Sequence, residues 1–523
     1  MYDILIRNAR IVDGTGAPWY YGDLGVQGGM ITAMGRLGGQ AARETVDADG
    51  LVLAPGFIDL HSHTDSTLPE YALGESRLFQ GITTEIGGNC GMSMAPAQPE
   101  TLDLLKDYMG QASYDWTGFG TFLDRMEEMR PSVNFGCLAG HGTVRIAVMG
   151  FSDRKADEEQ RKKIRNLVAE CMEEGAFGLS SGLIYPPGLF SDVEELAEAA
   201  SAVVPYGGYY CTHMRNENVR LIPALEEALE TAWRSGAPLQ VSHLKCTAKA
   251  DWQVSAKTAV AMIQRARRQG MDVACDQYPY RATSTTITNN FPDWGFEGGM
   301  DRFLERLRDP ETRAKLCAQS DSTHIGRWHE IIVSWTQCPE DAWMCGLDME
   351  EIGRRVGQPP VEALADLLLR AKGIADEIHY GMCEEDIEYI LAQPFVMVGS
   401  DGKSYPIDQP GKPHPRAYGA FARVLSHYSR QRKVISLETA VAKMTGMPAN
   451  RLGLYDRGLL RPGMRADLVL FDPEHIEDSP TFDQPQQACR GIHRVYVNGV
   501  LSAQDGQHTG ARAGIVLRKG KNT

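Results

Sequence analysis

Two patterns of apolar and polar residues divide the chain. Residues 1–54 and 455–523 alternate apolar and polar positions in short runs such as ILIRNARIV and HRVYVNGVL, separated by glycine and Asn-Gly turns. This alternation is typical of β-strands with one exposed face, and such turns join antiparallel strands. Because strands from both ends of a chain can pair in one domain, the pattern predicts a small composite β-sandwich domain built from the two terminal segments.

Residues 55–454 follow a different pattern, in which helix-like and strand-like segments alternate. Apolar residues on one helical face predict a helix over 157–174. The positions of that face are Ile164, Leu167, Val168, Cys171 and Met172. A second helix is predicted to begin at Ser191, where Glu194 would complete a capping box.

The predicted helices often end in glycine, and a short apolar strand then follows. These glycines recur about every 30 residues, which is the length of one β/α unit. Eight such strands can be counted, near residues 55–61, 82–88, 132–139, 176–181, 208–213, 238–243, 271–277 and 394–400. Eight β/α units predict an α/β fold with a TIM-like (β/α)8 barrel over 55–454.

Residues 284–350 interrupt the repeat after the seventh strand. They contain Trp294, Trp328, Trp335 and Trp343, half of the 8 tryptophans of the chain. We interpret the segment as an insertion that folds over the mouth of the barrel as a lid. The alternative is a peripheral subdomain without contact to substrate.

Charge and hydropathy exclude several classes of protein. The chain has 523 residues, with 53 lysines and arginines against 68 aspartates and glutamates, so its net charge is −15 at pH 7. Nucleic-acid-binding proteins normally carry a basic surface, so this charge argues against such a partner. The sequence contains no run of about 18 apolar residues, so it predicts no membrane-spanning helix. The first residues, MYDILIRNARIVDG, alternate like a strand and lack an apolar signal-peptide core, so a cytoplasmic protein is expected.

Residues that bind metals recur where the predicted strands end. In a (β/α)8 barrel the active site lies at the carboxyl ends of the strands, so these side chains are expected to converge. His61 and His63 follow the first strand, and residues i and i+2 of an extended segment point to the same side, so both can approach one ion. Cys90 stands among glycines after the second strand, and a thiolate is a good zinc ligand. The other candidates at strand ends are His213, His243 and Asp401.

Several motifs together carry a resemblance to a known family: PGFIDLHSH, ITTEIGGNCG, THMRNE, VSHLK, GSDG and HPRAYGAFARVL. The chain resembles the D-aminoacylase (N-acyl-D-amino-acid deacylase) family of the amidohydrolase superfamily. The C-terminal RPGMRADLVLFD is similar to the closing β-domain of that superfamily. Many superfamily members use a lysine on the fourth strand to bridge two metals, but GAFGLSSGLIY has none at that position. Cys90 matches the replacement seen in the D-aminoacylase group, which favours the narrower assignment.

The resemblance implies a zinc enzyme with one tightly bound ion. The ligands expected for the tight site are Cys90, His213 and His243. A second, weaker site, whose occupancy the sequence leaves open, is expected to use His61, His63, Cys90 and Asp401.

The implied reaction is hydrolysis of the amide bond of an N-acyl-D-amino acid, which gives a carboxylate and a free D-amino acid. A metal-activated water would attack the acyl carbon. Asp401 is expected to be the general base that takes the proton from the water and the general acid that passes it to the leaving amine. The preference for the D configuration comes from the resemblance alone.

Recognition of the small-molecule substrate requires a cation for its α-carboxylate. By the same resemblance, Arg416 matches the carboxylate-binding position and Lys245 matches a second one. Tyr185 and either Tyr278 or Tyr280 resemble the tyrosines that contact substrate.

Three polar residues near the predicted site have secondary roles or two interpretations. His141 follows the third strand and either lines the pocket or is a hydrogen-bonded core histidine. Arg215 and Glu217 are expected to orient His213, because a histidine that binds zinc needs a fixed ring.

Other functions remain as alternatives at this point. One is hydrolysis of a cyclic amide, as in hydantoinases and dihydroorotases, or of a dipeptide that contains a D-amino acid. Cys90, Arg416 and the missing strand-four lysine count against it. Another is an inactive scaffold. The full set of candidate ligands counts against it. An enzyme for acidic substrates would need an extra cation, for which Arg281 and Lys403 are candidates. The sequence makes no prediction of the oligomeric state.

Overall fold

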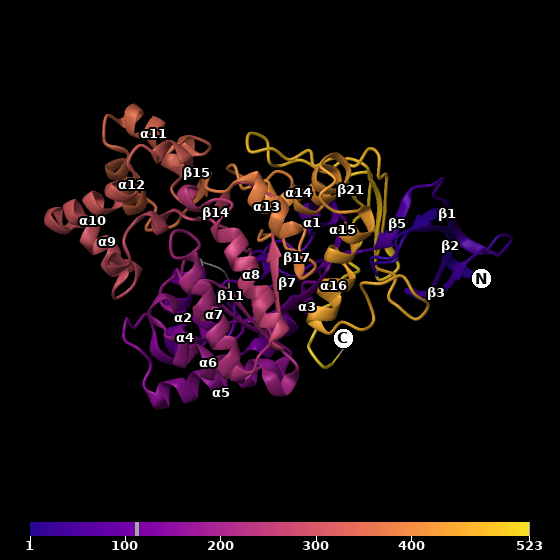
Figure 1. The fold of residues 1–523 in the computed structure, drawn as a ribbon, viewed down its shortest axis with the longest axis horizontal. Coiled ribbons are helices and arrows are strands. Elements are labelled where there is room, and N and C mark those ends of the chain that lie inside the picture. Colours follow the sequence, from indigo (N-terminus) through magenta and orange to yellow (C-terminus); the bar gives the residue numbers. More distant parts are fainter. Residues whose placement is uncertain (110–113, 522–523) are drawn as a thin grey trace.

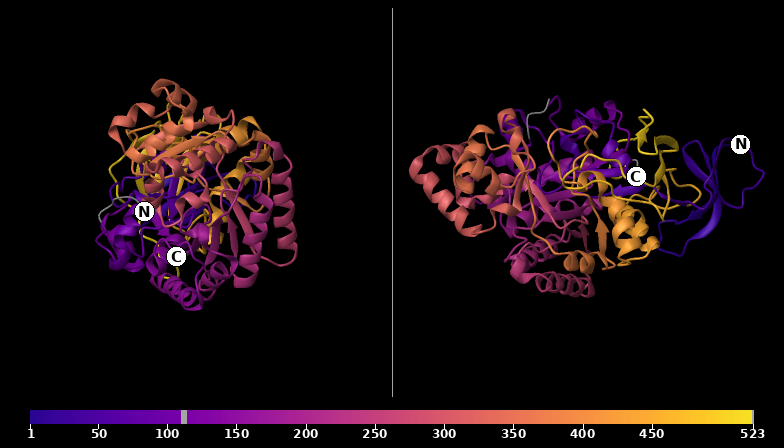
Figure 2. Two further views of the ribbon diagram at one scale, coloured as in Figure 1. Left: turned by 90° about the vertical axis from the view of Figure 1, so that its left-hand side faces the viewer. Right: turned by 90° about the horizontal axis from the view of Figure 1, so that it is seen from above.

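A computed structural model describes residues 1–109 and 114–521 (Figure 1). A central α/β region carries a helical lobe at one end and strands of the N-terminal segment at the opposite end (Figures 1 and 2). Among the described residues, no helix is both long and apolar enough to cross a membrane.

Parallel strands occupy each of the eight predicted positions of the central region. They form a three-stranded sheet and a six-stranded sheet, which lie next to each other at two places. The chain passes from β8 to β9 through Leu138 alone, and a parallel bridge joins Ser62, after β6, to Gly402, after β17. In sheet order the strands are β6 (Phe57–Asp59), β7 (Ile82–Gly87), β8 (Asn134–Cys137), and then β9 (Ala139–Gly140), β10 (Gly178–Gly182), β11 (Tyr209–His213), β12 (Leu239–Val241), β13 (Val273–Gln277) and β17 (Val396–Val398).

Helices between these strands bury an apolar face against the sheets. The predicted helix over 157–174 is confirmed as α5 (Glu158–Glu174), whose side chains Ile164 and Val168 are buried. The other helices of this region are α1 (Glu75–Leu78), α2 (Leu102–Met109), α3 (Phe119–Glu128), α4 (His141–Met149), α6 (Val193–Ser201), α7 (Leu221–Ser235), α8 (Ser255–Arg268), α13 (Glu384–Leu391), α14 (Arg416–Arg423), α15 (Leu437–Met444) and α16 (Gly446–Leu452).

The predicted start of the next helix, α6, is wrong by one residue. Asp192, not Ser191, caps the helix, because its carboxylate accepts a hydrogen bond from the backbone N–H of Glu195 at 3.1 Å. The Ser191 hydroxyl instead donates to the carbonyl of Gly188 at 2.6 Å. Both residue types favour the cap position, so the neighbouring turn decides which of them is used.

Strands from the two ends of the chain share one sheet of nine strands. Its central junction is the antiparallel pairing of β5 (Val52–Pro55) with β18 (Leu468–Phe471). The order runs β21-β20-β19-β18-β5-β1-β2-β3, and β4 also pairs with β1. The remaining strands are β1 (Tyr2–Ile11), β2 (Tyr20–Gln27), β3 (Met30–Gly35), β4 (Ala42–Asp47), β19 (Ile492–Val497), β20 (Val500–Gln504) and β21 (Gln507–His508).

The helical lobe has its own sheet and its own apolar core. Its three antiparallel strands are β14 (Thr283–Thr286), β16 (Ala375–His379) and β15 (Ile331–Thr336). The unit therefore continues to His379, beyond the end at 350 that the sequence suggested, because the last strand pairs back with the first. Its helices are α9 (Met300–Arg308), α10 (Pro310–Thr323), α11 (Met349–Val356) and α12 (Pro360–Arg370).

Glu377 of β16 makes the stability of this lobe sensitive to pH. Its side chain is 3% exposed, and it accepts a hydrogen bond from Asn290. Burial raises the pKa of Glu377 to about 8. An unfolded glutamate ionises near pH 4.3, about 4 units lower. Between these values the unfolded chain has lost a proton that the folded chain keeps, so stability falls as the pH rises through this window.

We therefore expect the Glu377→Gln variant to gain melting temperature relative to the native chain as the pH rises from about 5 to about 9. The gain at the upper end should be on the order of a few kcal/mol. Thermal melts across this range measure it, with Glu226→Gln, an exposed position on α7, as the control. Parallel curves for all three proteins would contradict the pKa argument.

Candidate metal centre

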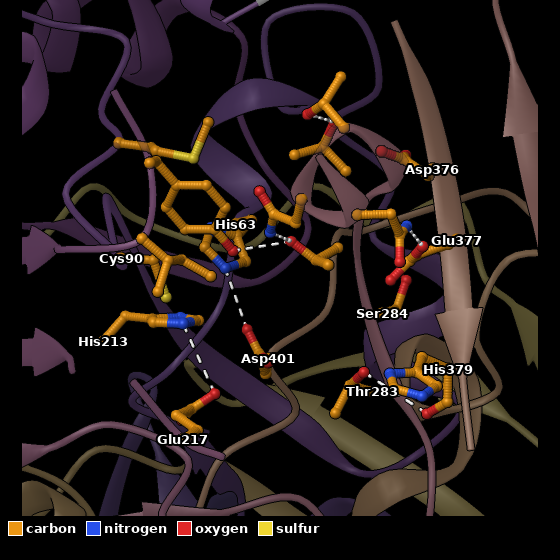
Figure 3. A pocket seen from close by; sticks show the side chains of 18 of the residues that line it. His63, Cys90, His213, Glu217, Thr283, Ser284, Asp376, Glu377, His379 and Asp401 are labelled. Atoms are coloured by element: carbon orange, nitrogen blue, oxygen red, sulfur yellow. Dashed lines mark hydrogen bonds and ion pairs between the residues drawn. The ribbon is translucent and has the colours of Figure 1, made fainter. Parts of the chain in front are cut away.

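Five strand ends bring the six predicted metal ligands into one cluster. His61 and His63 follow β6, Cys90 follows β7, and Asp401 follows β17. His213 closes β11, and His243 follows β12. Figure 3 shows His63 pointing to Asp401 and His213 pointing to Glu217. Because the strands are parallel, their carboxyl ends meet at one side of the sheets, as the sequence predicted.

Three of these residues have a left-handed backbone, which non-glycine residues seldom adopt. The φ angles are 54° at Cys90, 35° at His243 and 52° at Asp401. Such conformations cost on the order of 1–3 kcal/mol each and persist where the surroundings fix them, often at functional sites. Each of the three residues follows a strand end, and its side chain belongs to the cluster.

The Cys90 thiol lies at the centre of the cluster and is 3% exposed. Its Sγ is 3.4 Å from Nε2 of His61 and 3.5 Å from Nε2 of His243. Burial alone would raise the pKa of Cys90, but His61 and His243 outweigh it and hold the pKa well below its ordinary value. The site thus favours the thiolate, the form that binds metals.

Asp401 connects the cluster to a cation. Its Oδ1 lies 3.0 Å from Nε2 of His63 and 3.3 Å from Nε2 of His61, while its Oδ2 lies 2.7 Å from the Arg416 guanidinium. Burial opposes ionisation, yet Arg416, His243 and His61 hold the pKa of Asp401 well below its usual range. The carboxylate is therefore charged and can accept a proton.

Glu217 is the second carboxylate of the site, and its side chain is 10% exposed. Its Oε1 accepts from Lys245 Nζ at 2.7 Å and lies 2.9 Å from Nδ1 of His243. Its Oε2 is 3.5 Å from Nε2 of His213. Nδ1 of His243 also lies 2.8 Å from Lys245 Nζ. In the tautomer whose Nδ1 proton is donated to Glu217, Nε2 is free to bind a metal beside Cys90. Burial alone would raise the pKa of Glu217, but Lys245 and the two histidines lower it to about 2.

Arg215 does not orient His213, contrary to the prediction. Its guanidinium forms an ion pair with Glu227 at 2.8 Å and donates to the carbonyls of Leu189 and Ser191. The partner is twelve residues away on α7, and no local pattern in the sequence indicates that pairing.

The donor set fits a metal ion. Both ring nitrogens of His213 are buried without a hydrogen-bond partner among the described residues. Burial lowers the pKa of His213, which favours the neutral ring that binds metals. Ligand atoms of His61, Cys90, His243 and Asp401 all lie within 4.8 Å of one another. This set mixes members of the two predicted sites, and a second set joins His213, Glu217 and His243.

Asp276 is a supporting residue that the sequence analysis missed. It is buried at the end of β13, and its Oδ1 accepts from Nδ1 of His61 at 2.8 Å and from the backbone N–H of His243 at 2.9 Å. One carboxylate therefore fixes two candidate ligands. An aspartate among the apolar residues of a predicted barrel strand, in DVACDQY, is the signal that could have found it.

The charge around His61 supports the same conclusion. Burial alone would lower the pKa of His61, but Asp276, Cys90 and Asp401 together raise it well above its ordinary value. Anions that favour a proton on the ring also favour a metal cation at the same place.

The cluster lies at the floor of a cavity of about 1260 Å³. Lys245, Arg416, Tyr185 and Tyr278 line this cavity, as does the first strand of the lobe, β14. Lys245 and Arg416 lie over the Tyr278 ring, at 5.5 Å and 4.7 Å from its centroid, and the Tyr278 hydroxyl is buried without a hydrogen-bond partner in the described part of the chain. The Tyr185 hydroxyl bonds to Thr285 of β14 at 2.8 Å.

Two other predicted residues lie outside the lining of the cavity. Tyr280 packs against His414 and Phe482, which decides between the two tyrosines in favour of Tyr278 as the one that faces the cavity. His141 is fully buried and bonds to Glu195 at 2.9 Å, so it belongs to the core.

The chain matches known proteins over nearly its whole length. A model of the amidohydrolase family matches residues 44–503. A D-aminoacylase from Alcaligenes xylosoxydans xylosoxydans is 37% identical over 522 residues, which cover 99% of this chain and 98% of the relative. An N-acyl-D-aspartate deacylase from the same organism is 36% identical and covers 99% of this chain and 95% of the relative. The chain belongs to the D-aminoacylase family of amidohydrolases.

A solved structure of the family agrees with this fold. The N-acyl-D-glutamate deacylase from Bordetella bronchiseptica, in complex with zinc and a phosphonate mimic of the tetrahedral intermediate, is 33% identical, with a TM-score of 0.83 over 99% of both chains. The architecture is therefore the α/β, TIM-barrel type of the amidohydrolases. As predicted, β10 carries no lysine, and its side chains Ser180 and Ser181 form hydrogen bonds instead.

Loss of Asp276 should weaken metal binding without removing a ligand. We expect Asp276→Ala to lower zinc affinity about 10- to 100-fold, because the His61 ring and the His243 turn lose their anchor. Asp276→Asn keeps an oxygen that accepts a hydrogen bond from His61, so its zinc affinity should fall much less. Titration of the metal-free proteins against a chromophoric zinc chelator measures both. Unchanged affinity in a folded Asp276→Ala protein would contradict this role.

Proposed function

We propose that this chain is a zinc-dependent deacylase, which hydrolyses N-acyl-D-amino acids to a carboxylate and a free D-amino acid. The observation that carries the proposal is the buried Cys90 thiol beside His61 and His243, at the floor of a cavity whose wall presents Arg416. The likeness to D-aminoacylase and to the D-aspartate deacylase supports the D configuration.

The proposal assigns the tightly bound zinc to Cys90, His213 and His243. His61 and His63, with Cys90 and Asp401, would form a weaker second site. When bound, the ion lowers the pKa of water and polarises the scissile carbonyl. The solved deacylase that contains zinc supports this choice of metal. A D-aminoacylase whose binuclear metal centre has been described supports the presence of two sites.

Asp401 is the general acid and base in this mechanism. It is ionised in the free enzyme and lies between His63 and Arg416, so it can take a proton from the attacking water and deliver it to the leaving amine. When the substrate carboxylate also binds Arg416, that cation stabilises the Asp401 anion less. The basicity of Asp401 therefore increases when substrate is bound.

Three groups above the cluster bind the substrate. Arg416 and Lys245 attract the α-carboxylate, and a guanidinium can hold it with two hydrogen bonds. The Tyr278 hydroxyl, which has no partner in the described structure, donates a third bond. Tyr185 closes the cavity from the side of β10 through its bond to Thr285.

The proposed architecture places this site between two accessory units. The eight parallel strands close into a (β/α)8 barrel over 55–454, and segments 1–54 and 455–523 form a composite β-sandwich domain. The lobe that follows β13 acts as a lid, because its residues Ser284, Asn290 and Glu377 form part of the cavity wall.

The proposal predicts stereospecific, metal-dependent release of amino acids. The purified protein should hydrolyse N-acetyl-D-amino acids and leave the L enantiomers and cyclic hydantoins intact. Removal of metal by a chelator should abolish turnover, and added zinc should restore it. A chiral amino-acid assay measures the products. Release of L-amino acids only, or full activity without metal, would overturn the proposal.

Variants of Cys90 and Asp401 should separate binding of the metal from proton transfer. Cys90→Ala should lose tightly bound zinc and activity together. Asp401→Asn should keep the tight zinc and lose about 10²- to 10⁴-fold in kcat, because the amide cannot take a proton. Metal analysis and steady-state kinetics on the same samples test both. A Cys90→Ala protein with full metal content and full turnover would exclude Cys90 as a ligand.

A further inference from the structure

One lysine of the cavity has no role in the proposed chemistry. Within the described structure, the lysine and arginine side chains that line the cavity are Arg215, Arg220, Lys245, Lys403 and Arg416. Arg215, Lys245 and Arg416 each have a carboxylate partner within 2.8 Å, and Arg220 is exposed at the rim. Lys403 is half-buried, and among the described residues no hydrogen bond or ion pair reaches its ammonium group. It is a free positive charge inside the cavity.

The backbone places Lys403 near Arg416, the proposed α-carboxylate-binding residue, and we call this part of the cavity the corner. It stands two residues after Asp401, and Gly402 between them packs against the first turn of α14, where a Cβ would come within 3.0 Å of Ala417 Cα. Arg416 begins that helix. Lys403 and Arg416 also interact electrostatically. The two cations therefore approach the cavity from the same corner.

The wall facing this corner carries two carboxyl groups of the lobe. Asp376 and Glu377 lie across the cavity from Cys90 and His213 (Figure 3). Asp376 is within electrostatic range of Lys403 but forms no ion pair with it in the described structure. Burial raises the pKa of Glu377 to about 8, so this group is largely uncharged at neutral pH. The corner consequently keeps a positive charge that the protein does not neutralise by contact.

We propose that Lys403 binds a second carboxylate of the substrate, so that the enzyme prefers N-acyl-D-amino acids with an acidic side chain. In such a substrate one or two methylene groups separate Cα from the second carboxylate. The α-carboxylate on Arg416 and the side-chain carboxylate on Lys403 would then both be neutralised. This inference rests on the proposed deacylase function and names its substrate class.

Arg281, the other cation considered from the sequence, is placed elsewhere. Its side chain is 64% exposed and lies 3.9 Å from Glu384, outside the lining of the cavity. It therefore serves as a matched control: a cation of the same domain whose removal leaves the cavity unchanged.

The test compares an acidic substrate with its uncharged isostere. We measure kcat/KM for N-acetyl-D-glutamate and for N-acetyl-D-glutamine, and take their ratio in each protein. A general disturbance of the loop near Asp401 lowers both values and leaves the ratio unchanged. The native enzyme should favour the glutamate substrate, and Lys403→Met should lower the ratio at least about tenfold.

Three further variants complete the design. Lys403→Arg keeps the charge and should retain the ratio within about threefold. Arg281→Met should leave the glutamate-to-glutamine ratio unchanged. Asp376→Asn removes the anion that competes for Lys403 and should raise this ratio. A native enzyme that favours glutamine, or a Lys403→Met ratio equal to the native one, would overturn the inference.

Failure of the inference is distinct from failure of the proposed function. If the enzyme hydrolyses N-acetyl-D-glutamine but shows no charge-dependent ratio, only the role of Lys403 is wrong. If it hydrolyses no N-acyl-D-amino acid at all, with zinc present, the deacylase proposal itself fails.

Discussion

Mutual compensation of buried charges is the constraint on which this structure depends. Asp401 is buried and the side chain of Glu217 is only 10% exposed. A buried carboxylate without a partner would cost several kcal/mol. Arg416 faces Asp401, and Lys245 faces Glu217. Between these two pairs lie the Cys90 thiol and the histidines, whose positions follow from those of the carboxylates. Because each charge has a fixed partner, the cluster keeps its geometry at the floor of a wide cavity.

The strained turns show how the fold holds this arrangement. Cys90, His243 and Asp401 each adopt a left-handed backbone at a strand end. Next to Cys90, the backbone N–H of Gly91 donates to Ser180 of β10 at 3.0 Å. The Asp276 carboxylate fixes the His243 turn, and Asp59 of β6 accepts from the backbone N–H of Ser400 at 2.9 Å, next to Asp401. The energy that the turns cost is offset by contacts between neighbouring strands, so the two parallel sheets are themselves part of the site.

The sequence could predict which candidate ligands converge, because strand register is a local property. His61 and His63 share a side through their spacing, and Cys90, His213, His243 and Asp401 follow strands that the pattern identifies. Contacts between distant segments are not local, and there the prediction was incomplete. Asp276 in an apolar strand gives no spacing signal, and Arg215 turns to Glu227 on α7. The lobe extends to His379 because β16 pairs back with β14 across its own core.

In the proposed function, metal binding and substrate selectivity use different parts of the same cavity. Five candidate ligands lie at four strand ends, and they are His61, His63, Cys90, His213 and His243. Asp401, the proposed general base, and the proposed carboxylate-binding cations Lys403 and Arg416 all belong to residues 401–416. That segment leaves β17 and enters α14, so its length and composition can vary without moving His213 or His243. The facing wall comes from the lobe, a unit with a separate core. A side-chain subsite between this segment and the lobe can therefore be altered while the metal centre stays intact, which is how one fold can serve deacylases for different D-amino acids.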